Sequence, residues 1–241
     1  MQTAKAHIIS QLQNDILSWQ GFKPATTQTG DAGLGFIKEA FPCGTFPRAA
    51  IHELFCTSPE EASASSAFIA AILSALMKSG APSVWISASK NIFPSALPLF
   101  KIDPQKIIFI HAQKAKEILW TIEEALKCDC LSAVVGEISD INFTESRRLQ
   151  LAVEQSKVTG FLIRHRPKNL ATACVTRWNI KPLPTEKQAA LPGIGFPRWH
   201  VALLKVRNGK PGSWQIQWRE GQLELVQQSV LIHEQRERKI G

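Results

Sequence analysis

The sequence lacks a long hydrophobic run, an ordered cysteine pattern and a secretion signal. No run approaches the roughly 18 apolar residues of a membrane-spanning helix, and residues 1–19 lack a basic stretch followed by an apolar core. The five cysteines are odd in number and scattered, which argues against a disulfide framework. Cys128 and Cys130 are the only close pair and have no histidine nearby, so we expect no metal site. These absences predict a cytoplasmic protein without a membrane contact.

Positive charge is scarce in the first part of the chain and concentrated in the second. Residues 1–140 hold 11 basic and 13 acidic side chains, whereas residues 141–241 hold 17 basic and 7 acidic ones. The segment from Arg147 to Arg219 contains 14 basic residues and only two acidic ones, Glu154 and Glu186. An excess of this size indicates a polyanionic or acidic partner and says nothing about the fold.

Hydrophobic periodicity divides the chain into four parts. Residues 1–19 carry apolar side chains at helical spacing and predict an amphipathic helix. Residues 20–47 are rich in Gly, Pro and Thr and read as a linker. Residues 48–182 form the predicted core, and residues 183–241 a β-meander followed by a charged tail.

In the core, short β-type runs alternate with helical runs. The expected strands cover residues 49–56, 83–87, 106–111, 131–136, 159–164 and 173–180. The expected helices cover residues 59–79, 113–127 and 144–157. This alternation predicts an α/β fold with a mostly parallel twisted sheet and helices on both faces. After a connector with four prolines, runs of period two predict an antiparallel meander over residues 199–207, 213–219 and 222–226.

The first strand-to-helix turn is where such a sheet would bind phosphate, and it has lost the residues for doing so. A phosphate loop needs glycines to wrap the phosphates and a lysine to meet their charge. Neither residue type occurs between Leu54 and Met77. Ser58 instead matches a helix N-cap, with Pro59 at the first helical position. Glu60 and Glu61 then place two carboxylates where the triphosphate of a nucleotide would lie. Their negative charges would repel it.

The chain from Ala49 to Ile180 resembles the RecA recombinase core, and its particular motifs resemble the narrower ImuA family. The motifs are Ala50-Ile-His-Glu-Leu54, Val84-Trp-Ile-Ser87, Val134-Val-Gly-Glu137, Arg147-Arg-Leu-Gln-Leu-Ala152 and Thr176-Arg-Trp178. The resemblance covers nearly the whole chain. It implies a RecA-like fold and a relation to SulA cell-division inhibitors. It also implies action with an ImuB-like Y-family polymerase homologue and an error-prone replicative-type polymerase in SOS-induced translesion synthesis. The basic part of the chain adds RecA or single-stranded DNA as candidate partners.

Carried across residue by residue, the RecA functional positions are mostly lost. Only the hydroxyls of Ser65 and Ser66 remain at the phosphate loop, and Glu137 stands one residue from the magnesium-binding acid. No set of residues remains to orient a water on a γ-phosphate. We therefore expect a non-enzymatic protein without a cofactor. A divergent ATPase using these three residues is one alternative, and a SulA-like cell-division inhibitor is another.

The basic part of the chain interleaves cations with aromatic residues. This combination suits stacking on bases and also hot spots in protein interfaces, and composition does not separate the two. Tryptophan side chains that fill the core under arginine stems are the structural alternative, which we favour for Trp178 and Trp214. The candidate partner or DNA contacts are Arg147, Arg148, Arg164, Arg166, Lys168, Arg177, Arg198, Trp199, Arg207, Trp218 and Arg219. The leading hypothesis is a RecA-like adaptor that assembles a mutagenesis complex after DNA damage.

Overall fold

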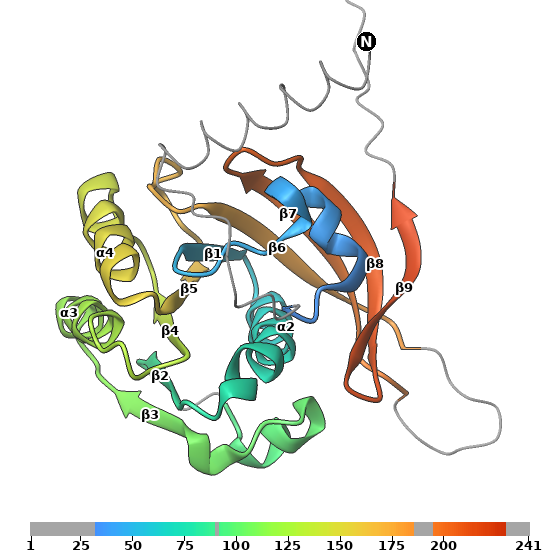
Figure 1. Ribbon diagram of the computed structural model, residues 1–241, viewed down its shortest axis with the longest axis horizontal. Helices are drawn as coiled ribbons and strands as arrows, with labels where there is room; N and C mark the ends of the chain where they lie inside the picture. Colours follow the sequence, from blue (N-terminus) through green and yellow to red (C-terminus); the bar gives the residue numbers. More distant parts are fainter. Residues whose placement is uncertain (1–31, 90–91, 186–194, 230–241) are drawn as a thin grey trace, which may run out of the picture. The chain divides into compact units, whose positions relative to one another are not determined.

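A computed structural model describes residues 32–89, 92–185 and 195–229, and these residues form one nine-stranded sheet (Figure 1). The strand order is β3-β2-β4-β5-β1-β6-β7-β8-β9. The predicted N-terminal helix and the charged tail from residue 230 onward lie outside the described residues.

The first six strands run parallel, and the last three continue the same sheet antiparallel. The parallel strands are β1 (Ile51–Cys56), β2 (Ser83–Ser87), β3 (Ile107–His111), β4 (Ala133–Ile138), β5 (Thr159–His165) and β6 (Thr176–Leu183). The antiparallel strands are β7 (Arg198–Val206), β8 (Gly212–Arg219) and β9 (Gln222–Ser229). The predicted fold class is confirmed. The meander is not a separate unit, however, because β6 pairs with β7 along its whole length.

Helices cover both faces of the sheet, as predicted. Helix α2 (Pro59–Leu76) packs on one face within the larger apolar cluster. Helices α3 (Ala115–Leu126) and α4 (Phe143–Ser156) pack on the other face within a second cluster. Gly136 on β4 allows α3 to approach closely, because a Cβ there would collide with Ile122. Short 3₁₀ helices connect these elements: η1 (Gly35–Ala40), η2 (Pro42–Gly44), η3 (Met77–Ser79), η4 (Pro94–Phe100) and η5 (Pro104–Lys106).

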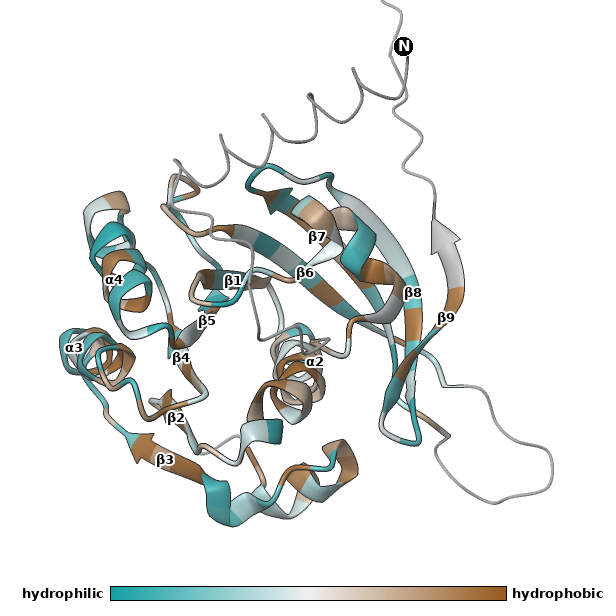
Figure 2. Ribbon diagram, in the orientation of Figure 1, coloured by the Kyte–Doolittle hydropathy of each residue, from teal (hydrophilic) through white to brown (hydrophobic). Residues whose placement is uncertain are grey.

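Figure 2 shows apolar residues gathered along α2 and along the strands that it covers. Helix α2 and the turn after it, Pro59–Ser79, are long and apolar enough to span a membrane by length and composition alone. In this fold the helix is a core element, since most of its length is buried against the sheet. A buried core helix can have the length and apolar composition of a membrane-spanning helix without crossing a membrane.

The interpretation of residues 20–47 as a linker is wrong for the part that the structure describes. Residues 32–47 form η1 and η2 and bury Leu34, Ile37, Phe41 and Phe46 in the larger apolar cluster. The glycines and prolines here start and end 3₁₀ turns. They do not mark a segment without contacts, because the apolar residues between them supply the burial that stabilises it. Residues 20–31 lie outside the described part of the chain.

A buried histidine joins this N-terminal segment to the sheet. The ring of His52 stacks on Phe46 at 4.4 Å and on Phe161 at 5.3 Å between centroids. Its Nε2 is 2.9 Å from the Pro47 carbonyl, and its Nδ1 is 2.7 Å from Thr176 Oγ1. The carbonyl can only accept, so Nε2 donates to it. A neutral ring has one N–H, so Nδ1 then accepts from the Thr176 hydroxyl. Burial lowers the pKa of His52 to about 3.

This histidine predicts a loss of stability in mild acid. The unfolded chain takes up a proton near pH 6.5, but the folded chain does so only near pH 3. The free energy of unfolding should therefore fall by about 1.4 kcal/mol per pH unit below pH 6.5, or about 2 kcal/mol at pH 5. Urea titrations at pH 7 and pH 5 measure this. His52→Gln removes the titrating group and should flatten the dependence by that amount. Equal losses in the two proteins would contradict the assignment.

Candidate functional site

The turn between β1 and α2 is closed by its own side chains. The Ser58 hydroxyl accepts a hydrogen bond from the Glu61 amide at 3.3 Å, so Ser58 is the N-cap that the sequence predicts. The Glu61 carboxylate accepts from the Thr57 amide at 2.7 Å and from the Thr57 hydroxyl at 2.9 Å. Asn179 on β6 also donates to this carboxylate, at 3.4 Å. The carboxylate therefore occupies the backbone amide to which a phosphate would bind at this turn.

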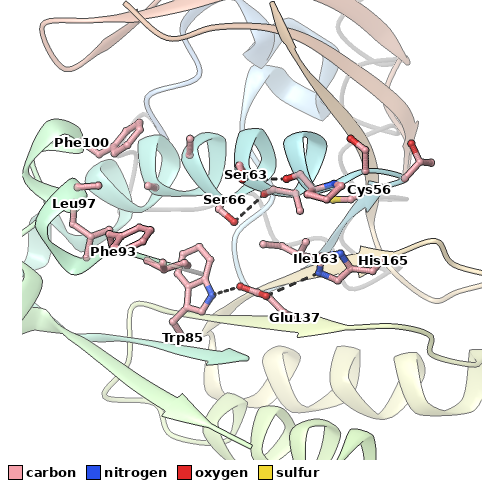
Figure 3. Close-up of a pocket in the computed structure, with 18 of the residues that line it drawn as sticks. Cys56, Ser63, Ser66, Trp85, Phe93, Leu97, Phe100, Glu137, Ile163 and His165 are labelled. Carbon is pink, nitrogen blue, oxygen red and sulfur yellow. Dashed lines mark hydrogen bonds and ion pairs between the residues drawn. The ribbon is translucent and has the colours of Figure 1, made fainter. Parts of the chain in front are cut away.

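A pocket of about 770 Å³ opens beside this turn, at the carboxyl ends of β1, β4 and β5. Figure 3 shows α2 above it, Trp85 and Glu137 below, and Phe93 and Leu97 from the η4 region at one end. Among the residues predicted for a nucleotide site, Ser58, Ser66 and Glu137 line the pocket. Ser65 is fully buried against the Cys56 thiol at 3.4 Å, and Glu60 is exposed outside the lining. The structure thus brings only part of the predicted set together.

Glu137 forms the polar floor of the pocket. Its Oε1 accepts a hydrogen bond from the Trp85 indole at 3.0 Å, and its Oε2 lies 4.0 Å from His165 Nε2. Burial raises the pKa of this carboxyl group. No lysine lines the pocket, and among the described residues no group of three or more His, Cys, Asp or Glu could hold a metal ion. These residues do not fit a magnesium–triphosphate group.

Several predicted partner contacts are internal instead. Arg164 is fully buried and donates to Glu53 at 2.8 Å, to Asp140 at 2.7 Å and to the Asn169 carbonyl at 2.8 Å. Arg177 donates to Glu53 at 2.7 Å and to the carbonyl of Leu170. The prediction of Arg164 as a partner contact is wrong, because its side chain is fully buried against the Glu53 carboxylate, which requires cationic partners. Arg177 is partly buried and serves the same carboxylate.

The predicted aromatic contacts Trp199 and Trp218 are also wrong, since both side chains are buried. They lie in the larger apolar cluster with Trp178 and Trp214, which the sequence assigns to the core. The Trp218 indole donates to the Leu99 carbonyl at 2.9 Å, so its one polar atom is satisfied inside the fold. Arg207 likewise donates to the Ala173 carbonyl at 3.1 Å, which ties it to the loop after β5.

The remaining candidates fall into two separate groups. Arg147 and Arg148 lie on α4, where they pair with Glu154 and Glu123 respectively. Arg166 and Lys168 are exposed on the loop between β5 and β6, and Arg166 donates to the Thr57 carbonyl at 3.1 Å. This loop also packs on the start of α4, because Ala173 donates to the Ser146 hydroxyl at 3.0 Å. Arg198 and Arg219 are partly exposed on the antiparallel strands β7 and β8, and the Arg219 guanidinium lies over the Phe196 ring.

Two features escaped the sequence reasoning. One is Glu53, a carboxylate in the middle of the apolar run of β1, which is itself a signal that a buried cation is needed. The other is the apolar wall of the pocket from the η4 region, formed by Phe93, Leu97 and Phe100.

The fold and the pocket define the class. This is a RecA-like α/β protein whose first strand-to-helix turn is closed by a helix cap and a carboxylate. The structure of the RadB recombinase is similar in fold, with a TM-score of 0.53 and 14% identity over 77% of this chain and 94% of that chain. No known family model matches the chain.

Sequence relatives give the particular family. Two curated proteins named Protein ImuA, from two strains of Caulobacter vibrioides, are each 30% identical to this chain over 213 residues. The match covers 81% of this chain and 87% of each relative. The chain therefore belongs to the ImuA family, as its motifs predict.

The buried ion network predicts unequal effects of two neighbouring cations on stability. Arg164→Ala should lower the free energy of unfolding by about 3–5 kcal/mol, because it leaves the carboxylate of Glu53 buried with fewer partners. Lys168→Ala, on the exposed loop, should change it by less than about 0.5 kcal/mol. Urea denaturation followed by tryptophan fluorescence measures both. A loss below about 1 kcal/mol for Arg164→Ala would show that the network does not stabilise the fold.

Proposed function

We propose that this protein is a non-enzymatic, cytoplasmic adaptor that helps assemble a translesion synthesis complex during the SOS response to DNA damage. Membership of the ImuA family supports the process. The Glu61 carboxylate bound to the Thr57 amide, at 2.7 Å, is the observation that carries the non-enzymatic role. It replaces an anion-binding turn with an internal hydrogen bond, so the RecA-like core acts as a scaffold.

The partners in this proposal are an ImuB-like Y-family polymerase homologue, an error-prone replicative-type polymerase, and RecA or single-stranded DNA. The surface we assign to them is the loop after β5 together with the outer side of α4. It carries the exposed cations Arg147, Arg148, Arg166 and Lys168. Exposed Phe143 and Leu170 lie on the same two elements. Apolar anchors beside arginines are typical of interfaces between proteins.

Equilibrium titration with a fluorescent ATP analogue tests the non-enzymatic role. No saturable binding should appear, with or without Mg²⁺, because the turn offers no free cradle of amides and no lysine. ADP serves as the matched competitor. Micromolar, Mg²⁺-dependent binding that Glu137→Ala abolishes would overturn this part of the proposal in favour of a divergent ATPase.

Charge reversal tests the surface. The double variant Arg166→Glu/Lys168→Glu should weaken binding to the ImuB-like partner by about tenfold or more, or 1.4 kcal/mol. The matched control is Lys78→Glu/Lys106→Glu, which reverses two exposed charges near the amino ends of β2 and β3. Biolayer interferometry over a range of salt concentrations measures affinity. Equal binding by both variants would contradict the assigned surface.

The same salt series separates a protein partner from DNA. Contacts with phosphates reduce affinity by roughly 0.7 to 0.9 log units per log unit of salt for each phosphate neutralised. A shallow dependence on salt for the ImuB-like partner, without measurable binding of single-stranded DNA, would assign the surface to protein.

A further inference from the structure

The pocket beside the closed turn has the size and lining of a binding site for a small apolar group. Its volume of about 770 Å³ lies within the range of ligand-binding pockets. One wall is a run of small side chains on α2, including Ala62, Ser66 and Ala70. Phe93 and Leu97 from the η4 region line one end of the pocket, and Trp85 lies opposite the helix (Figure 3). Small residues on one side and large apolar residues on the other leave a slot that suits a flat ring.

An apolar side chain at the mouth of this slot is left in water. Phe93 lines the pocket, yet 72% of its surface is exposed. Leu97 and Phe100, on the same 3₁₀ segment, are buried. An occupant between Phe93 and α2 would remove this apolar surface from water, which favours binding at roughly 25 cal/mol per Å².

The serine hydroxyls and the Glu137 carboxylate of the slot are hydrogen-bond acceptors. The hydroxyls of Ser63 and Ser66 donate to the carbonyls of Pro59 and Ala62 on their own helix, each at 3.0 Å. Their oxygen lone pairs therefore face the pocket as acceptors. Glu137 supplies a carboxylate at the floor and accepts one bond from Trp85. The Thr57 hydroxyl donates to the Glu61 carboxylate and is not available to a ligand. The inner part of the pocket therefore offers a ligand few hydrogen-bond donors.

The charges around the slot disfavour an anion. Glu137 and Glu61 lie at the floor and at the adjoining turn. His165 lies beside Glu137, with its Nε2 4.0 Å from Oε2, and the exposed Arg166 lies beside the turn, where its Nε already donates to the Thr57 carbonyl. A ligand that reaches Glu137 therefore meets a carboxylate and acceptor oxygens, and a phosphate or sulfonate there would be repelled.

We propose that this pocket binds a flat apolar group that carries an N–H donor, with its ring between α2 and the η4 region and its donor on Glu137. An aromatic amine or an indole has this chemistry. The group is either part of a free molecule or a side chain of a partner protein. The site lies where the RecA-like fold would hold a nucleotide, but its lining favours a neutral N–H donor over an anion.

The test uses two dyes that share one ring skeleton. N-phenyl-1-naphthylamine is neutral and has an N–H donor, and 8-anilino-1-naphthalenesulfonate adds a sulfonate. The neutral dye should bind saturably with a rise in fluorescence, and the sulfonate should bind about tenfold more weakly or less. Glu137→Gln keeps an acceptor but removes the charge, so it should reduce this difference. ATP should not displace the neutral dye.

Matched serine variants locate the binding site. Ser66→Phe fills the slot and should weaken binding of the neutral dye by about tenfold. Ser74→Phe is the control, because Ser74 lies on the same helix and its hydroxyl also donates to a carbonyl of that helix, Ala71, but it lies outside the pocket. Ala96→Phe fills the slot from the exposed η4 side, so the test stands if one variant fails to fold by circular dichroism. Absence of saturable binding, equal binding of the sulfonate, or wild-type binding by both filled variants would overturn the proposal.

A displacement experiment shows whether the bound apolar group comes from a free molecule or from the ImuB-like partner. Adding the ImuB-like partner to the dye-loaded protein releases the dye if the group is a side chain of that partner, and leaves it bound if the group is a free molecule. Both outcomes require the site to exist. Dye binding needs this chain alone, so its failure would leave the proposed adaptor function untouched.

Discussion

Glu53 places a carboxylate with no exposure to water in the middle of β1, between β5 and β6. Such a group persists only when cations and donors surround it. Arg164, Arg177 and Thr172 fulfil this requirement, and each comes from β5, from β6 or from the loop that joins them. The path of the chain after β5 therefore follows from one acidic residue in the central strand.

The same requirement explains where much of the positive charge is used. The loop after β5 has a series of backbone carbonyls that basic side chains bind by donating hydrogen bonds. Arg164, Arg177, Lys205 and Arg207 donate to the carbonyls of Asn169, Leu170, Thr172 and Ala173 respectively. A loop held in this way is ordered before any partner arrives, which reduces the entropy cost of binding. The basic excess is thus partly structural, and a count of charges overstates the surface available to a partner.

The sequence predicted the order and type of the core elements because their signals are local. Alternating strand and helix patterns, the Ser58 cap and the Glu220-Gly221 turn, with its two positive φ angles, all depend on neighbours in the chain. The errors concern burial, which depends on residues far apart in sequence. Arg164 forms an ion pair with Glu53, which precedes it by more than a hundred positions in the sequence. Trp199 packs against Phe68 of α2 and Trp218 against Phe100 of η4, and composition cannot show on which side of a strand a tryptophan lies.

The closed turn also determines what a phosphate-binding loop at this position would require. Inserting the missing glycines and lysine would not rebuild a phosphate loop, because Glu61 would still hold the Thr57 amide and contact Asn179 on β6. The carboxylate, its cap and its strand partner would have to change together, and each change alone would weaken the start of α2. A phosphate-binding turn could therefore not be made here by adding glycines and a lysine alone, because the Glu61 carboxylate would still occupy the Thr57 amide.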